Sequence, residues 1–244
     1  MSGTRTGPAD YPDRMDRGLY IAASGMLAEQ IRQDQIAGDL ANSATPGYKA
    51  DRTAQRQFGE LLLANRSSGA GVGAQSTAVQ VDRIETDFTP RPSRETGEPL
   101  DFAITGEGFF SLRTAGGVRY TRNGQFTVSP QGLLVTAQGD PVLGRGGRTV
   151  RVGADGRVDP RVLEVVRLDG ARKQGDNLVS GAPAGTAGTG QVRAGALEAS
   201  GSDAARSMVD MIASLRAFEA GQRVIQTIDE TLGKAASQVG AVSG

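Results

Sequence analysis

The sequence contains neither histidine nor cysteine, and these two absences exclude many kinds of chemistry at once. Without histidine there is no Ser-His-Asp or Cys-His catalysis and no metal site built on imidazole. Without cysteine there is no disulfide bond, no thiol nucleophile and no cysteine-ligated metal. Tryptophan is also absent, and aromatic residues make up only 5% of the chain. These absences argue against most classes of enzyme.

The chain has no excess of charge, because 27 basic residues balance 27 acidic ones among 244. A balanced chain has no electrostatic footprint for nucleic acid or for an anionic membrane. No apolar run approaches the roughly 20 residues that cross a bilayer, and residues 1–14 lack the apolar stretch of a cleaved signal peptide. These facts fit a cytoplasmic protein or one exported without a cleaved signal, and the lack of cysteine weakly favours export.

Glycine, by contrast, is abundant, with 35 glycines beside 10 prolines. This content is about twice ordinary usage and predicts many turns or glycine-rich linkers within a folded protein. Residues 15–42 and 203–239 have helical character, whereas residues 79–168 are typical of short strands. Glycine-rich joints at residues 67–73 and 180–190 separate these blocks. The two helical ends are similar in character, so we expect them to meet.

The C-terminal segment has the clearest periodicity. Its seam positions alternate steps of four and three residues, and they are Ala204, Met208, Met211, Leu215, Phe218, Gln222, Ile225, Asp229 and Leu232. A heptad seam of this length keeps one stripe of a helix facing a partner helix. The N-terminal segment has the same rhythm at Leu19, Ala22, Met26, Gln33, Ile36 and Leu40. The two segments are therefore predicted to pair as a coiled coil.

Three polar residues, Gln33, Gln222 and Asp229, interrupt these otherwise apolar seams. Two interpretations stand side by side. The residues are either tolerated imperfections, or they set the register of the helices at some cost in stability.

The N-terminal helix is expected to end near Asn42, because a turn follows it. Thr45-Pro46-Gly47-Tyr48 favours a type II turn, with proline second and glycine at the third position, which needs a positive φ. Tyr48 then has two possible roles, either covering the helix end or touching a neighbouring subunit.

The middle of the chain is predicted to form short antiparallel strands. Turn signals separate them, and these are Gly116-Gly117, Asn123-Gly124, Ser129-Pro130-Gln131-Gly132 and Asp155-Gly156. Asn-Gly is the strongest short signal for a hairpin. Close spacing of strands without long helices favours a β-sandwich or a rolled sheet. Four aromatic residues alternate within the predicted hairpins, where core packing is favoured over a carbohydrate or base platform: Phe109, Phe110, Tyr120 and Phe126.

The remaining chemistry is sparse. The glycine-rich stretches complete no phosphate-binding motif, because none follows a strand and opens a helix. Two carboxylates, Asp101 and Glu107, flank the strand that contains Phe102, and paired carboxylates can hydrolyse glycosides without histidine. Nothing in their spacing places them at a catalytic separation, so turn chemistry and solvated strand edges are the favoured interpretation.

The chain resembles the axial proteins of the bacterial flagellum, most closely the basal-body rod proteins of the FlgF/FlgG type. Three separate stretches carry the resemblance. They contain the segments Met15–Met26 and Leu40–Lys49, then Thr96–Phe110, Tyr120–Gly124 and Phe126, and finally Met208–Ile212, Arg216–Glu219 and Ile225–Asp229. Together these stretches span nearly the whole chain in the order of the family.

The resemblance implies a structural subunit of the rod, without enzyme activity, cofactor, metal or small-molecule substrate. Proteins of this family are exported by the flagellar type III apparatus and stack helically with copies of themselves and with neighbouring rod or hook proteins. Their paired terminal helices form the inner tube, and the β domain lies outside it. The expected location is therefore the basal body, without membrane insertion, and the expected partners are other axial subunits and the export apparatus.

The resemblance and the blocks along the chain together give the expected domain boundaries. The family usually begins at the position of Met15, so residues 1–14 are expected to be an additional, disordered leader, with translation starting at either Met1 or Met15. Residues 15–66 are then the N-terminal helix and Pro-Gly turn segment, residues 67–194 the central antiparallel, sandwich-like β domain, and residues 195–244 the C-terminal coiled-coil helix. The expected fold class is α+β.

We expect subunit assembly to depend on the apolar seams and on the turn that follows the first helix. The seam residues are Leu19, Met26, Ile36, Leu40, Met208, Met211, Leu215, Phe218, Ile225 and Leu232. The turn residues are Asn42, Thr45, Pro46, Gly47 and Tyr48. Competing hypotheses are an extracellular β binding module oligomerised by a coiled coil, a hook subunit, and a carboxylate-based hydrolase of cell-wall glycan.

Overall fold

The computed structural model describes residues 11–64, 71–187 and 190–241, which form two compact units. Among the described residues, one unit contains residues 11–38, 53–64, 71–85 and 205–241, and the other contains residues 39–52, 86–187 and 190–204. Residues 1–10 of the expected leader lie outside the described residues. The first unit thus combines residues from the N-terminal and the C-terminal blocks of the sequence.

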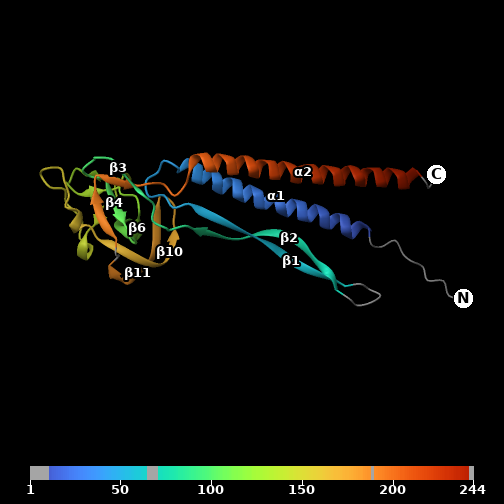
Figure 1. Cartoon of the computed structure of the whole chain (residues 1–244), viewed down its shortest axis with the longest axis horizontal. Coiled ribbons are helices and arrows are strands. Elements are labelled where there is room, and N and C mark those ends of the chain that lie inside the picture. Colours follow the sequence, from blue (N-terminus) through green and yellow to red (C-terminus); the bar gives the residue numbers. More distant parts are fainter. Residues whose placement is uncertain (1–10, 65–70, 188–189, 242–244) are drawn as a thin grey trace. The chain divides into compact units, whose positions relative to one another are not determined.

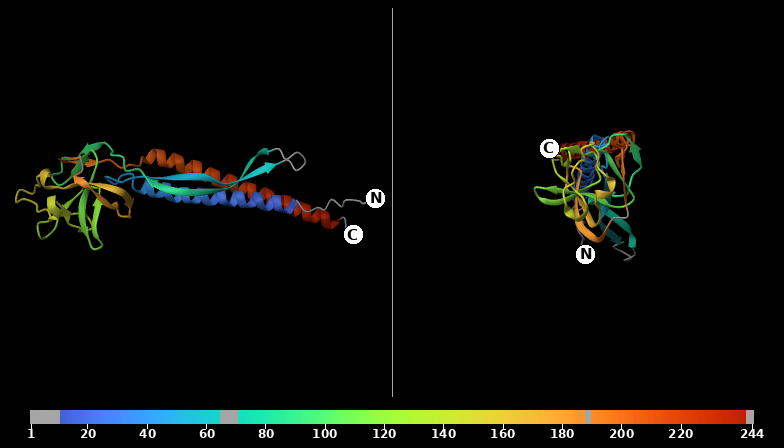
Figure 2. Two further views of the ribbon diagram at one scale, coloured as in Figure 1. Left: turned by 90° about the horizontal axis from the view of Figure 1, so that it is seen from below. Right: turned by 90° about the vertical axis from the view of Figure 1, so that its left-hand side faces the viewer.

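The first unit contains two long helices, α1 (Tyr11–Ala41) and α2 (Ala204–Ala241), which run side by side (Figures 1 and 2). Helix α1 begins four residues before the Met15 expected from the sequence. Gly18 lies against Ile228, and Gly221 lies against Met26. Residue numbers rise along one helix as they fall along the other, so the helices are antiparallel.

The stripe of buried and half-buried residues along α2 differs in part from the predicted seam. Its buried and half-buried heptad positions are Ala204, Ser207, Met211, Ser214, Phe218, Gly221, Ile225, Ile228 and Leu232. The seam prediction was therefore wrong at Gln222 and Asp229, which are exposed, and Met208 and Leu215 are also exposed, at 54% and 44%. Serine or glycine occupies three of the alternate positions, Ser207, Ser214 and Gly221, where small side chains let the two helices approach closely.

The first unit also contains a hairpin of strands β1 (Asp51–Ala64) and β2 (Gly71–Thr86), which pair only with each other among the described strands. The glycine-rich joint expected at residues 67–73 lies outside the described residues as far as residue 70. Its last three residues belong to β2.

The second unit is built mainly of short strands. They are β3 (Ser93–Glu95), β4 (Phe102–Thr105), β5 (Phe109–Thr114), β6 (Gly117–Thr121), β7 (Thr127–Val128), β8 (Leu134–Val135), β9 (Val142–Leu143), β10 (Val165–Lys173), β11 (Leu178–Ala187), β12 (Gln191–Ala194) and β13 (Ala196–Glu198). Two 3-10 turns, η1 (Arg145–Gly147) and η2 (Pro160–Val162), precede β10.

Five of these strands form an antiparallel sheet in the order β10-β11-β6-β5-β9. Strand β10 also pairs with β5, so the sheet rolls up into a closed circuit of four strands. The pairing of β10 with β5 therefore agrees with the rolled sheet, one of the two arrangements predicted from the sequence. Register shifts along β10 explain the closure, because bulges bend a strand and allow it to change partner. Strand β11 also takes up most of residues 180–190, which were expected to be a joint.

The core of the second unit is apolar and aromatic. The Phe126 ring lies 5.4 Å from the ring of Phe110 and 6.2 Å from that of Phe102, measured between centroids. Phe109 and Tyr120 belong to a second buried cluster with Val179. Core packing of the four alternating aromatic residues is therefore confirmed.

The turn signals were correct with one exception. The hairpin between β5 and β6 turns at Ala115-Gly116, with Gly117 opening β6, residues 129–132 connect β7 to β8, and residues 153–156 form a turn. Asn123-Gly124, however, does not close a hairpin. Its glycine lies against β4, where the amide of Phe102 donates to the Gly124 carbonyl over 3.0 Å. A Cβ at Gly124 would lie only 1.6 Å from the Phe102 carbonyl oxygen, so this glycine serves close backbone approach.

Neither described helix has an apolar stretch of the length and hydropathy that crossing a membrane requires.

Gly124→Ala is expected to destabilise the second unit by about 3 kcal/mol, because the added methyl group forces two backbone segments apart. Gly116→Ala is the matched control, since an added Cβ there meets only side-chain atoms, the Arg119 guanidinium at 3.4 Å and the Thr114 hydroxyl at 3.9 Å. Urea denaturation followed by circular dichroism measures both losses. Equal losses in the two variants would contradict the close approach.

Candidate functional site

The turn after α1 has the geometry that its sequence predicts. The Tyr48 amide donates to the Thr45 carbonyl over 3.3 Å, and Gly47 has φ +64°. At the start of the turn, the Thr45 hydroxyl donates to the side-chain oxygen of Asn42 over 3.1 Å. A Cβ at Gly47 would lie 2.3 Å from the Arg122 carbonyl oxygen, so both its φ and its surroundings require glycine.

The turn is fastened to the strands around it. The Gly47 amide donates to the Glu198 carbonyl over 3.0 Å, and the Asn177 side-chain amide donates to the Pro46 carbonyl over 2.9 Å. The Ser200 hydroxyl donates to the Asn42 carbonyl over 2.8 Å. Backbone groups of the turn are thus satisfied by residues more than 100 positions away in the sequence.

Tyr48 lies over the end of α1. Its side chain is buried, and its hydroxyl donates to an Asp39 carboxylate oxygen over 2.8 Å. The Lys173 ammonium lies 4.0 Å from the centre of the Tyr48 ring and donates to the Lys49 carbonyl and to Asp51. Of the two roles weighed for Tyr48, the structure shows the first, covering the helix end.

Burial governs the titration of this tyrosine and its partner. Burial raises the pKa of the Tyr48 phenol, and the hydrogen bond to Asp39 raises it further. Burial also raises the pKa of the Asp39 carboxyl group, although the hydrogen bond from Tyr48 partly offsets this effect. The phenol therefore stays protonated in the folded chain well beyond its ordinary range.

A buried charge cluster of Lys49, Arg122 and Glu198 lies beneath the turn, and each of these residues is only 2% exposed. One Glu198 carboxylate oxygen accepts from the Lys49 ammonium over 2.7 Å, and the other accepts from the Arg122 guanidinium over 2.9 Å. The first oxygen also accepts from the Arg91 amide over 2.9 Å. Burial lowers the pKa of Lys49, and the neighbouring Glu198 carboxylate opposes that shift.

The remaining donors of the buried charge cluster bond mainly to backbone carbonyls. The Lys49 ammonium donates to the Thr89 carbonyl over 2.7 Å, and Arg122 donates to the carbonyls of Ile104 and Gly106. Removing charges from water costs several kcal/mol per ion, so such a cluster is tolerated only when its hydrogen bonds are nearly complete. Sequence reasoning missed this cluster, because no local pattern links Glu198 to Lys49.

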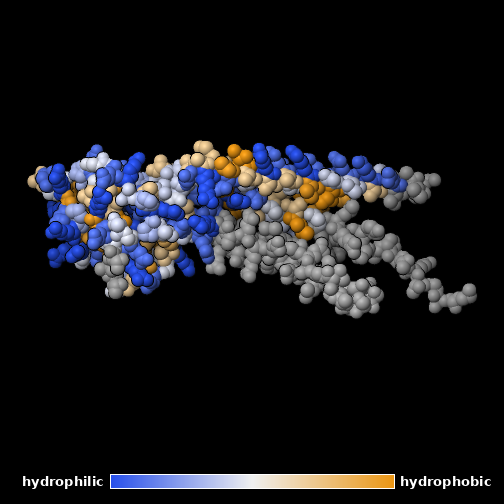
Figure 3. All heavy atoms as spheres, viewed as in Figure 1, coloured by the Kyte–Doolittle hydropathy of each residue, from blue (hydrophilic) through white to orange (hydrophobic). Residues whose placement is uncertain are grey.

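Large apolar side chains remain exposed on both helices of the first unit. They are Tyr20 and Leu27 on α1, and Met208, Val209, Ile212, Leu215 and Val224 on α2. Orange apolar surface is visible along α2 in Figure 3. Of the other predicted seam residues, Ile36 is buried, and Leu19, Met26, Leu40, Met211, Phe218, Ile225 and Leu232 are half-buried.

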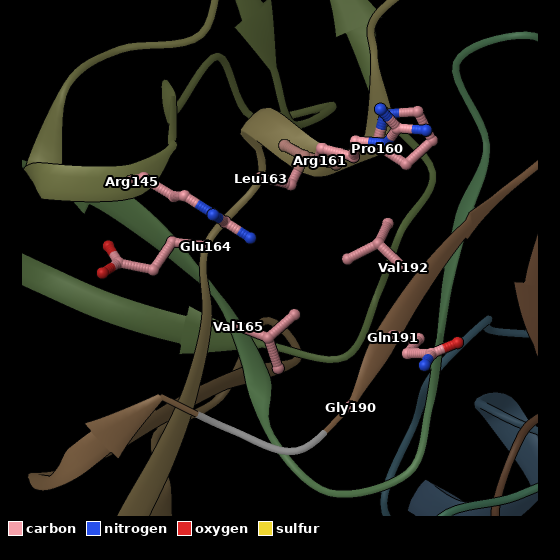
Figure 4. A pocket seen from close by; sticks show the side chains of 9 residues that line it. All are labelled: Arg145, Pro160, Arg161, Leu163, Glu164, Val165, Gly190, Gln191 and Val192. Atoms are coloured by element: carbon pink, nitrogen blue, oxygen red, sulfur yellow. The ribbon is translucent and has the colours of Figure 1, made fainter.

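A cleft of about 690 Å³ lies in the second unit between the start of β10 and the start of β12. Leu163, Val165 and Val192 face it, and Arg145 and Glu164 extend toward one another at one side (Figure 4). None of the turn residues or seam residues lines it. Within the described ranges, no group of three or more acidic side chains has the arrangement of a metal site.

Three family sequence models match separate parts of the chain. The model described as flagella basal body rod protein matches residues 19–49. The model described as flagellar hook protein FlgE/F/G D1 domain matches residues 103–160, and the model described as flagellar basal body rod FlgEFG protein C-terminal matches residues 193–238. Lys49, Arg122 and Glu198 each come from a different one of these three segments.

Relatives of nearly full length carry the same description. The flagellar hook-basal body complex protein FlhO of Bacillus subtilis is 30% identical over 93% of this chain and 100% of its own length. The flagellar basal-body rod protein FlgG of the same species is 31% identical over 89% of this chain and 97% of its own. The flagellar basal-body rod protein FlgF of Escherichia coli is 32% identical over 91% of this chain and 97% of its own length.

Glu198→Gln is expected to destabilise the chain by about 3 kcal/mol, because it leaves two buried cations without a counter-charge. Glu95→Gln is the control, since Glu95 pairs with Arg193 at an exposed position and is expected to contribute less than about 1 kcal/mol. Both values follow from equilibrium denaturation at pH 7. A similar loss in both variants would show that the buried charge cluster is not a major source of stability.

Tyr48→Phe is expected to flatten the alkaline loss of stability. A phenol whose pKa is higher in the folded chain stabilises it fully below the ordinary pKa of about 10, and this stability is lost as the pH rises through the raised value. The variant also loses about 1.5–3 kcal/mol at pH 7 with the hydrogen bond to Asp39.

Denaturation between pH 7 and 11 measures both effects. Tyr120→Phe is the control at pH 7, because the Tyr120 hydroxyl makes no hydrogen bond within the part of the chain that the structure describes. An unchanged alkaline slope in Tyr48→Phe would contradict the assigned role of the phenol.

Proposed function

The chain belongs to the flagellar basal-body rod protein family, and from this premise we propose that it assembles through the exposed apolar faces of its two terminal helices. As a member of this family it is a structural subunit of the rod and is located in the flagellar basal body. The proposal concerns the surface that performs this function.

The exposed apolar side chains of α2 are the single observation that carries the proposal. Met208, Val209, Ile212 and Leu215 lie within two turns of one helix and are each at least 44% exposed. Burying apolar surface contributes about 25 cal/mol per Å², so these side chains favour contact with another subunit. The intramolecular stripe of α2 is lined partly by serine and glycine, which leaves its larger apolar residues for such contacts.

The two helices pair as a coiled coil within one subunit in this proposal. The heptad steps of the α2 stripe and its contacts with α1 support that arrangement. Contacts in a helical stack are heterologous and do not close, so one subunit needs several different apolar faces. Tyr20 and Leu27 on α1 supply a second exposed pair.

The partners in this proposal are copies of the same chain and neighbouring rod or hook subunits. The flagellar export apparatus, which would deliver the chain to the growing rod, is a further partner. The chain performs no catalysis in this account. The family described for its full-length relatives supports this account over the binding-module and hydrolase hypotheses.

Leu215→Asp is expected to abolish assembly while the isolated chain stays folded. Leu215 is 44% exposed, so the new charge is hydrated in the single chain but would be buried and unpaired between subunits. Gln226→Asp, which adds the same charge at an exposed polar position of α2, is the matched control.

Swimming in soft agar and mass spectrometry of isolated hook–basal bodies measure assembly, and circular dichroism measures folding. We expect Leu215→Asp cells to be non-motile with no variant chain in the particles, and Gln226→Asp cells to swim. Normal motility of Leu215→Asp cells would overturn the proposed surface.

A further inference from the structure

The heptad pattern of the two terminal helices does not by itself define how they align. Met211, Phe218, Ile225 and Leu232 repeat every seven residues, so sliding α2 by one heptad places similar side chains against α1. Something other than the apolar repeat must therefore select one register. The described contacts between α1 and α2 contain three pairs that are matched in size or polarity.

Two of these pairs match a large side chain with a glycine. A Cβ at Gly18 would lie 3.4 Å from the terminal carbon of Ile228, an ordinary contact distance, so Ile228 packs directly over Gly18. In the second pair the glycine is on α2 and the large residue is on α1. A Cβ at Gly221 would lie 2.7 Å from the Met26 Cγ. Each helix thus supplies one large residue and one glycine.

The third pair is polar. The Ser214 hydroxyl is 2.6 Å from a Glu29 carboxylate oxygen and 3.3 Å from the Glu29 carbonyl, and Ser214 is only 1% exposed. A buried hydroxyl needs an acceptor, because leaving it unpaired costs free energy. The side-chain nitrogen of Gln33 does not select the register, because it is buried and has no hydrogen-bond partner within the described ranges. Gln222 and Asp229 do not supply it either, because both are exposed.

A slip of one heptad in either direction breaks these matches. Sliding one way brings Met26 against Ile228, two large residues, and brings Glu29 against Gly221, which has no hydroxyl. Sliding the other way keeps a serine at Glu29 but places Ser214 against Met26, where only glycine fits. It also brings Gly18 against Gly221, which leaves a void.

We propose that Gly18–Ile228, Met26–Gly221 and Glu29–Ser214 together lock the register of α1 and α2. The inference rests on the proposed coiled-coil pairing of these helices. Its consequence is that each subunit presents one fixed set of exposed apolar residues, because a slip would realign the exposed side chains of α2 with those of α1.

The experiment uses the absence of cysteine from the chain, since two introduced cysteines form the only possible intramolecular disulfide. Ala22→Cys is combined in turn with Phe218→Cys, Ile225→Cys or Leu232→Cys. Ala22 is one helical turn from Met26, and Ile225 is one turn from Gly221, so the locked register predicts the disulfide between positions 22 and 225. Slips of one heptad predict the disulfide with position 218 or 232.

Gly221→Met then tests the lock, with Gly233→Met as the matched control, because a Cβ at Gly233 meets nothing within 4 Å. We expect a several-fold loss of the 22–225 disulfide in Gly221→Met and no loss in Gly233→Met. Adding Met26→Ala to Gly221→Met reverses the large and small partners and is expected to restore the disulfide. An unchanged yield of the 22–225 disulfide in Gly221→Met would overturn the lock. Failure of Met26→Ala to restore the disulfide would also overturn it, even if Gly221→Met alone is unfolded.

The polar pair has its own test. Ser214→Ala is expected to lower the melting temperature of the chain, whereas Ser237→Ala, which removes a hydroxyl that bonds only within α2, is expected not to do so. Equal melting temperatures would remove Ser214 from the lock. If no 22–225 disulfide forms even without a lock variant, the proposed pairing itself fails, and that result is distinct from a pairing that forms but tolerates Gly221→Met.

Discussion

The carboxylate of Glu198 is the constraint on which the second unit depends. It accepts hydrogen bonds from Lys49, Arg91 and Arg122, which come from segments far apart in the chain, and it does so almost out of contact with water. A buried ion pair is weak evidence for net stability, but losing one partner is costly because the remaining charges stay buried. Because the Gly47 amide also bonds to the Glu198 carbonyl, the same residue ties these segments to the turn after α1.

The first unit follows a different principle, in which small residues decide what is buried and what is exposed. Ser207, Ser214 and Gly221 occupy alternate heptad positions of the α2 stripe, whereas Met208 and Leu215, one residue further along, remain exposed. A monomer that buried its largest apolar residues in its own helix pair would have less exposed apolar surface for contact with a neighbouring subunit. The distribution in this chain suits a protein whose stability as a single chain is secondary to its assembly.

Local patterns in the sequence predicted much of this structure. The C-terminal end of α1, the positive φ of Gly47, the hairpin at Gly116-Gly117 and the aromatic core follow from preferences that act over a few residues. Two features lay beyond such reasoning. The buried charge cluster joins Lys49 to Glu198, which are 149 positions apart. Asn123-Gly124 does not form the predicted hairpin turn, and Gly124 instead accepts a hydrogen bond from the Phe102 amide. The helix stripe was predicted with the right period but misplaced by one residue at every other position, since size matching across two helices is invisible in either helix alone.

The central claim, that the exposed apolar residues of the terminal helices join subunits within the rod, is tested most directly by electron cryo-microscopy of isolated basal bodies that contain this chain. The account predicts density in which Met208, Ile212 and Leu215 of α2 are buried against adjacent subunits, while Glu198 keeps its partners within one subunit. Density in which the α2 face stays exposed to solvent, with subunits joined only through their β domains, would contradict it.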